Sequence, residues 1–134
     1  MELQVGVKIL LNNGEGKYLV VRRSAEKYPE VGAKWDIVGG RIDVGTSLLD
    51  NLKREVKEET GLDIKYEPKL ITAQDILRIK GKHIVRLTYL GVAEGEVRLS
   101  DEHLEYKWLT LEEMSMLEPM DIYFKEVLSK FDLS

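Results

Sequence analysis

The sequence predicts an α+β fold, an α/β/α sandwich in which a mixed β-sheet packs against a central helix and a C-terminal helix. Segments typical of strands precede and follow one amphipathic segment near the middle of the chain. A second amphipathic segment closes the chain. Strands and helices that each carry an apolar face bury these faces in layers, so this order indicates helices packed on a sheet.

The first half of the chain supplies the first strands. Residues 3–11 are apolar with partial alternation, and residues 18–23 are rich in β-forming types, so the two segments are predicted to pair as a hairpin. A polar loop with Pro29 and Gly32 follows. Residues 35–38 are expected to form a short strand that Gly39 and Gly40 break.

The central helix has start and stop signals at both ends. Ser47 is a suitable N-cap, and Asp50 stands where it would complete a capping box. Gly61 is placed as a left-handed C-cap residue. The apolar stripe between these ends consists of Leu48, Leu49, Leu52 and Val56.

The second half is predicted to return to the sheet before it ends in helices. Residues 62–80, 82–92 and 104–109 have the pattern of strands, with Gly81 in the turn between the first two. Thr110 and Glu113 form the capping box of a short helix. Pro119 suits the first position of the C-terminal helix. The apolar positions expected on that helix are Ile122, Phe124, Val127, Leu128 and Phe131.

Length and composition limit the possible classes of protein. The chain has 134 residues, of which 43% are hydrophobic and 33% charged, so we expect one globular domain over residues 1–134. Cysteine is absent, which excludes disulfides, zinc–thiolate sites and thiol nucleophiles. The net charge of −4 argues against general binding to nucleic acid. No segment has a signal-peptide or membrane-span pattern, so a cytoplasmic protein is expected.

Three carboxylates share one face of the central helix. Glu58 and Glu59 lie on either side of Glu55, each within about 60° of it. Like charges at this spacing repel, and the C-terminal end of a helix disfavours negative charge. A cation would relieve both effects, and carboxylate oxygens favour Mg²⁺ or Mn²⁺. The alternative is a solvated face that is neutralised by Lys53, Arg54 and Lys57.

The spacing around these glutamates resembles a family signature. Gly40 is followed after five residues by Thr46 and after seven more by the sequence Arg-Glu-Val-Lys-Glu-Glu-Thr-Gly-Leu at 54–62. This resembles the Nudix box, Gly-x5-Glu-x7-Arg-Glu-U-x-Glu-Glu-x-Gly-U, where U is aliphatic. Thr46 replaces the first glutamate, and Val38 stands where proline is common. Because that glutamate often pairs with the box arginine, we expect Arg54 to pair with Asp43 or Asp50 instead.

The resemblance implies a Nudix pyrophosphohydrolase that cleaves a diphosphate linkage in a nucleoside diphosphate derivative. By position, Glu58 and Glu59 would be the principal Mg²⁺ ligands, and Mn²⁺ is a possible substitute. Glu55 would be a third ligand or part of the base machinery, and the Gly40 carbonyl would complete the metal shell. Glu55 and Glu58 are therefore both expected to take part in catalysis.

The later acidic segment at 101–108 resembles the family segment that supplies an outer acid. Glu102 is the preferred candidate and Glu105 the second, the alternative being that both are surface charges beside a turn. His103 is expected to lie in a loop or to line the substrate site rather than bind metal, because hard metals favour oxygen. His83 is interpreted as a plain strand residue.

Basic and aromatic residues give weaker indications of a substrate site. Arg23 could point into the cleft, and Arg41 is placed to touch phosphate oxygens. Trp35 could stack on a base, but a core position is favoured, and Trp108 is expected to pack. The remaining strand arginines are interpreted as ordinary strand residues: Arg22, Arg78 and Arg86.

The resemblance leaves the substrate open between a nucleoside triphosphate and a nucleotide sugar. Thr46 favours an alternative, a catalytically weakened Nudix-fold module that binds nucleotides or regulates another protein. A non-enzymatic domain is a third hypothesis, which would leave the box spacing as coincidence. The expected partner is a small molecule, with no general nucleic acid binding and no membrane, and a homodimer is possible.

Overall fold

The computed structural model describes residues 1–26 and 33–130, so the expectations for Pro29, Gly32 and Phe131 lie outside the described residues. The strands are β1 (Glu2–Asn12), β2 (Tyr18–Arg23), β3 (Trp35–Asp36), β4 (Val38–Arg41), β5 (Asp63–Ile76), β6 (Lys82–Glu94) and β7 (His103–Leu109). The helices are α1 (Leu48–Thr60), α2 (Leu111–Met116) and α3 (Ile122–Lys130).

The strands form one mixed sheet around β1. Strand β6 runs parallel to β1 from the pair Glu2–Lys82 to the pair Asn12–Val92, and β5 pairs antiparallel with β6. Strand β4 pairs antiparallel with β1. The predicted hairpin of β1 with β2 is wrong in extent, because these strands pair only at Asn12 and Tyr18. Strand β2 pairs along its length with β7 instead.

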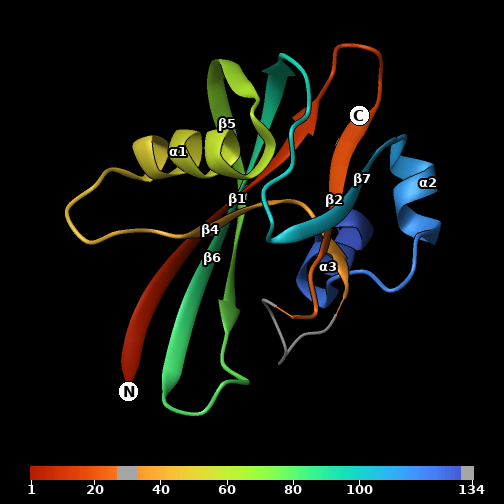
Figure 1. The fold of residues 1–134 in the computed structure, drawn as a ribbon. Helices are drawn as coiled ribbons and strands as arrows, with labels where there is room; N and C mark the ends of the chain where they lie inside the picture. Colours follow the sequence, from red (N-terminus) through yellow and green to blue (C-terminus); the bar gives the residue numbers. More distant parts are fainter. Residues whose placement is uncertain (27–32, 131–134) are drawn as a thin grey trace.

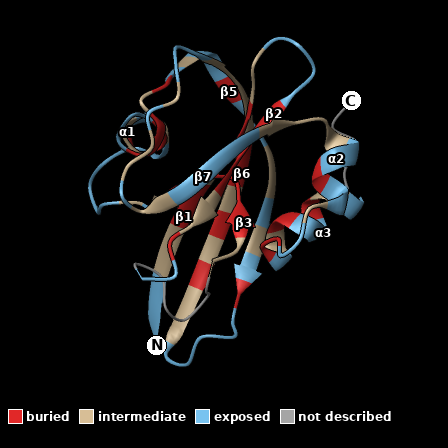
Figure 2. Ribbon diagram, turned by 45° about the vertical axis from the view of Figure 1, so that its right-hand side comes forward, coloured by how far each residue is buried: buried red, intermediate tan, exposed pale blue. Residues whose placement is uncertain are grey.

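The helices cover opposite faces of the sheet, which confirms the α+β sandwich (Figure 1). On one face, Leu52 and Val56 of α1 pack against Val7, Ile9 and other apolar residues of the sheet. On the other face, Met114 of α2 and residues of α3 pack against a second apolar cluster. Figure 2 shows that the buried residues lie mainly along the strands and on the inner sides of the helices. Burial of both clusters holds the layers together.

The glycine pair does not end a strand, as the sequence predicted, but lies inside β4. Gly39 and Gly40 pair with Lys8 and Val7 of β1. Gly39 has a φ of +146°, and a Cβ at this position would overlap the Val7 carbonyl oxygen. The absence of side chains therefore lets β4 lie directly against β1, rather than breaking the strand.

The C-terminal helix begins at Ile122, so the predicted start at Pro119 is wrong. The preceding residues hydrogen-bond to Trp35, whose N–H donates to the Pro119 carbonyl at 2.8 Å and whose carbonyl accepts from Asp121 N–H at 2.8 Å. The Asp121 carboxylate then accepts from the N–H groups of Tyr123 and Phe124 at 3.1 and 3.0 Å. Asp121, not Pro119, is thus the residue that caps α3.

The other helix ends agree more closely with the sequence. Gly61 ends α1 with a φ of 74°, and both halves of the capping box of Thr110 and Glu113 are present in α2. Ser47 accepts from the Asp50 N–H, which is one half of the capping box predicted for α1. The strand predicted to reach residue 80 ends at Ile76. Among the helices of residues 1–26 and 33–130, none has the length and apolar character needed to cross a bilayer.

Candidate active site

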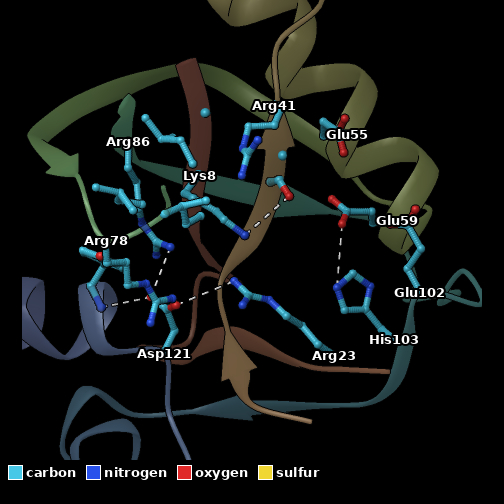
Figure 3. A pocket seen from close by; sticks show the side chains of 17 residues that line it. Lys8, Arg23, Arg41, Glu55, Glu59, Arg78, Arg86, Glu102, His103 and Asp121 are labelled. Carbon is cyan, nitrogen blue, oxygen red and sulfur yellow. Dashed lines mark hydrogen bonds and ion pairs between the residues drawn. The ribbon is translucent and has the colours of Figure 1, made fainter. Parts of the chain in front are cut away.

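A cavity of about 410 Å³ opens between α1 and the sheet (Figure 3). Carboxylates lie at one end, which we call the acidic end and define by Glu55, Glu59 and Glu102. Basic residues from the strands and from the connection between β5 and β6 lie at the other end, which we call the cationic end: Lys8, Arg23, Arg41, Arg78 and Arg86. The cavity therefore presents groups of opposite charge to the two ends of a ligand.

The orientation of α1 about its own axis determines which of its side chains point toward the acidic end. Leu52 and Val56 are fully buried against the sheet, so the neighbouring helix face turns toward the cavity. Glu59 is only 3% exposed, and Glu55 is half-buried. Burial raises the pKa of Glu55. Burial also raises the pKa of Glu59 well above its ordinary value, against the opposing charge of Lys8 and with the support of Glu55.

The third box glutamate faces a smaller hollow beside the main cavity. This hollow, of about 130 Å³, is lined by residues of α1 and of the segment before β7, namely Glu55, Glu58, Glu59, Ser100, Asp101 and Glu102. Glu58 therefore does not line the main cavity, but it shares one hollow with the other box glutamates. The structure also places Glu102, the predicted outer acid, in this same hollow.

Backbone hydrogen bonds attach the segment that carries Glu102 to the end of α1. The Arg98 N–H donates to the Thr60 carbonyl at 2.6 Å, and the Ser100 N–H donates to the Glu59 carbonyl at 3.1 Å. These carbonyls lie in the last turn of α1, where no further helical N–H is available. The helix end thus fixes the segment from which Glu102 reaches the acidic end.

Gly40 approaches the helix closely enough that a side chain would not fit. A Cβ on Gly40 would lie 2.9 Å from both Cδ and Oε2 of Glu55. The glycine therefore leaves room for the Glu55 carboxylate beside the backbone of β4. This places the Gly40 backbone at the acidic end, as the family spacing led us to expect.

Arg54 pairs with Asp43, one of the two substitute partners that the sequence predicted. It donates from Nη1 to the Asp43 carboxylate, and from Nη2 to Glu55 Oε1 at 3.2 Å. The hydrogen bond with Asp43, together with that carboxylate's charge, raises the pKa of Arg54. Thr46 contributes through its backbone, since its carbonyl accepts from Asn51 Nδ2 at 2.9 Å. The loop is therefore connected to α1 without the usual glutamate.

His103 lies against Glu59 in the cavity wall. Its Nε2 is 3.7 Å from Glu59 Oε1, and both side chains are almost fully buried. Burial, with the nearby charges of Lys8 and Arg23, lowers the pKa of His103 to about 4, so the ring is neutral at pH 7. This position confirms that His103 lines the cavity.

The acidic end suits a hard divalent cation. Glu59 Oε2 is buried and has no hydrogen-bond partner. A buried carboxylate oxygen without a partner is costly, and a cation would satisfy it. The surrounding donors are almost all oxygens, which Mg²⁺ and Mn²⁺ prefer. In the described residues, no group of three acidic or histidine side chains is already arranged as a finished metal site.

The cationic end is built around the buried carboxylate of Asp36. Arg86 contacts it at 3.0 Å and Lys8 at 3.2 Å, and Arg23 forms a third ion pair with it. Burial alone would raise the pKa of Asp36, but the charges of Arg86, Lys8 and Arg23 hold it well below its ordinary value. Arg86 and Arg23 also reach Asp121, at 3.1 and 3.7 Å.

Comparison with known proteins decides the family. A family model described as the NUDIX domain matches residues 2–131. The chain belongs to the Nudix family. The structure of a MutT protein from Methanosarcina mazei Go1 superimposes with a TM-score of 0.86 at 31% identity, covering 98% of this chain and 94% of that one.

Two curated relatives match shorter segments of this Nudix chain. An RNA pyrophosphohydrolase from Bartonella bacilliformis is 42% identical over 60 residues, which are 42% of this chain and 35% of the relative. An asymmetrical bis(5'-nucleosyl)-tetraphosphatase from Rattus norvegicus is 33% identical over 88 residues, 62% of this chain and 60% of the relative. The match thus spans between about a third and three fifths of these relatives.

The sequence does not predict all of the residues that line the Nudix cavity. Arg78 and Arg86, interpreted as ordinary strand residues, line the cavity, while Arg23 and Arg41 line it as expected. The sequence does not predict Lys8 and Asp121 as site residues, although both line the cavity. A lysine in the middle of an apolar strand was the one available signal for Lys8.

The other candidate residues contact structural neighbours and do not line the cavity. Glu105, the second choice for the outer acid, pairs with Arg22 at 3.2 Å and does not line the cavity. Trp35 is 4% exposed and belongs to the core, as favoured. His83 lies on β6, where its ring contacts Asp75 at 2.7 Å.

Proposed function

We propose that this Nudix domain catalyses the Mg²⁺-dependent hydrolysis of a diphosphate linkage in a nucleoside diphosphate derivative, by attack of water on phosphorus. The substrate would be a nucleoside triphosphate or a nucleotide sugar. The observation that carries the proposal is the meeting of Glu55, Glu58, Glu59 and Glu102 around one hollow. The two curated relatives are named as a pyrophosphohydrolase and a tetraphosphatase, which supports this reaction class.

In this proposal Glu58, Glu59, Glu55 and the Gly40 carbonyl hold the metal. The orphaned Oε2 of Glu59 and the space left by Gly40 support this set. Mn²⁺ could replace Mg²⁺, since both prefer oxygen ligands. A bound divalent cation supplies charge neutralisation of the diphosphate and a lowered pKa of bound water.

The chain's own residues then position the substrate and move the proton. Glu102 and Glu55 are the candidates that accept the proton of the attacking water, because both border the hollow. Arg41 and Arg23 lie in the cavity wall and would bind phosphate oxygens. Glu58 completes the proposed catalytic set with Glu55 and Glu102.

The proposed partner is a small molecule, and the net charge of −4 supports the absence of general nucleic acid binding. A cytoplasmic location fits the lack of cysteine. Thr46 leaves one competing function, a Nudix-fold module that binds nucleotides without turnover. A homodimer stays a prediction, which light scattering after gel filtration would test.

The test is hydrolysis of a panel of nucleoside triphosphates and nucleotide sugars with Mg²⁺, followed by product identification. We expect release of nucleoside monophosphate, abolished by EDTA. Glu59→Gln should reduce kcat/KM by at least about 100-fold, since even outer-shell changes at metal sites cost 10- to 100-fold. The matched control is Glu112→Gln, an exposed glutamate on α2.

Each outcome of this test is decisive. Turnover that is unaffected by Glu59→Gln would contradict the assigned metal site. Stabilisation of the protein by nucleotides, without turnover on any compound of the panel, would favour the binding module instead.

A further inference from the structure

The cationic end of the cavity contains more positive charge than its own carboxylates neutralise. Lys8, Arg23 and Arg86 surround Asp36. Asp121 adds the second negative charge to this buried network, and Figure 3 shows it beside Arg23 and Arg86. Three cations therefore face two carboxylates. Burial, together with the charges of Arg23 and Arg86, lowers the pKa of Lys8 despite its contact with Asp36.

Two further arginines increase this excess at the cavity wall. Arg78 lies over the Tyr123 ring, 5.4 Å from its centroid, and Arg41 donates to the Gln4 side chain. Within residues 1–26 and 33–130, neither arginine forms an ion pair with a carboxylate. Both guanidinium groups therefore remain available for an anionic ligand.

Arg86 provides an independent sign that the network is incomplete. Its side chain is only 5% exposed, and its Nε is buried without a hydrogen-bond partner. A buried N–H of a charged group that lacks an acceptor is unfavourable. Because Arg86 also lines the cavity, a ligand oxygen is a chemically suitable partner for this end of the site.

The two ends of the cavity would then bind different parts of one ligand. In the proposed function, the acidic end holds the metal, and Arg23 and Arg41 bind oxygens of the diphosphate next to it. The rest of the substrate then extends toward the other basic residues of the cationic end, Lys8, Arg78 and Arg86. A neutral sugar would leave the excess positive charge uncompensated there. A carboxylate or a phosphate would accept charge-assisted hydrogen bonds from the arginines and the lysine.

We propose that the substrate carries, beyond the cleaved diphosphate, a further anionic group that lies against Lys8, Arg78 and Arg86. This inference depends on the proposed function for the direction in which the substrate lies. It narrows the substrate class to diphosphate compounds that have an additional carboxylate or phosphate. The same nucleotides without that group are expected to be poorer ligands.

Lys8 is the most useful residue for the test, because its removal leaves the rest of the network balanced. In Lys8→Met, Asp36 and Asp121 still face Arg23 and Arg86. Arg78→Gln is a second variant, at an exposed position where loss of folding is not expected. Lys69→Met is the matched control, an exposed lysine on β5 that does not line the cavity.

The experiment compares matched ligand pairs that differ in one anionic group. The pairs are UDP-glucose with UDP-glucuronic acid, and NADH with NADPH. Binding is measured by calorimetry in EDTA, where no metal-dependent turnover occurs, and kcat/KM is then measured with Mg²⁺. We expect at least one pair to show about a tenfold preference for the more anionic member, the size of one hydrogen bond to a charged group.

The variants separate this subsite from general charge attraction. Lys8→Met and Arg78→Gln should each reduce the preference at least about threefold, whereas Lys69→Met should keep it. Equal binding within both pairs, or a preference that both cavity variants retain, would overturn the inference. Because binding in EDTA needs no hydrolysis, a preference without turnover would overturn the proposed function and leave the anion subsite supported.

Discussion

Asp36 joins three basic residues that come from three different strands. Lys8 lies on β1, Arg23 on β2 and Arg86 on β6, and all three contact this one buried carboxylate. A buried ion pair from which one partner is removed leaves uncompensated charge in a low-dielectric interior. Asp36 is therefore the residue on which the integrity of the cationic end depends.

The first prediction concerns acid stability. The folded structure lowers the pKa of Asp36. Its contribution to the free energy of unfolding is therefore fully present at pH values above about 3.9, the pKa of Asp in the unfolded chain. The contribution is lost as the pH falls below that value, since the unfolded chain then binds more protons. Asp36→Asn should cost about 3–5 kcal/mol at pH 7.

Urea denaturation at pH 7 and at pH 3 measures this effect. The difference between wild type and Asp36→Asn should be smaller at pH 3. A difference that stays constant across this range would show that the charge of Asp36 is not what stabilises the fold.

The second prediction concerns Gly40. In Gly40→Ala the new Cβ would lie 2.9 Å from the Glu55 carboxylate, so Glu55 must move. Overpacking of this kind costs about 1–3 kcal/mol. We expect a lower Tm and weaker Mg²⁺ binding by calorimetry. Gly6→Ala is the control for stability, because its Cβ would meet no atom closer than 3.7 Å.

At this scale, the sequence predicted the acidic end better than the cationic end. The box glutamates were found because one helix turn brings them together at fixed spacing. Lys8 and Arg86 meet only because β1 and β6 run parallel, with Gly6 opposite Arg86 and Lys8 opposite Thr88. That register depends on tertiary pairing, which local spacing does not encode.

At the scale of elements, the loop before α1 is connected to the helix through Arg54 and Asp43 in place of the usual glutamate. In the third prediction, Asp43→Ala lowers the Tm because Arg54 loses this partner, and Thr46→Glu in the same background restores it. Differential scanning fluorimetry of the four combinations measures the coupling. If Thr46→Glu changed the Tm equally with and without Asp43, the two acids would not share Arg54.

The elements were predicted well where the signals are local. The caps of α1 and α2 follow from single residues such as Gly61 and Thr110. Local signals do not predict the start of α3, because the segment before it hydrogen-bonds to Trp35, far away in the sequence. Local patterns also do not predict that the glycine pair lies inside a strand, because its close packing against β1 depends on the tertiary fold.

For the whole molecule, metal binding and folding should be linked. A ligand that binds only the folded state stabilises it, by about 2.7 kcal/mol at 100 times its Kd. Since the pKa of Glu59 is raised by burial, protons compete with the metal at low pH. As the fourth prediction, the Tm increase caused by Mg²⁺ should be larger at pH 8 than at pH 6.

Thermal melts with and without Mg²⁺ at both pH values test this. Glu59→Gln should remove most of the increase, while Glu112→Gln should preserve it. An increase of equal size at both pH values would indicate that Glu59 does not bind the ion.

The attachment of the segment before β7 to the end of α1 has a consequence for local unfolding. The N–H groups of Arg98 and Ser100 donate to carbonyls in the last turn of α1. These amides can exchange with solvent only when the helix end opens. Hydrogen exchange should therefore show Arg98 and Ser100 exchanging together with the last turn of α1, as one cooperative unit. An opening of that unit would separate Glu102 and Glu59 in a single event.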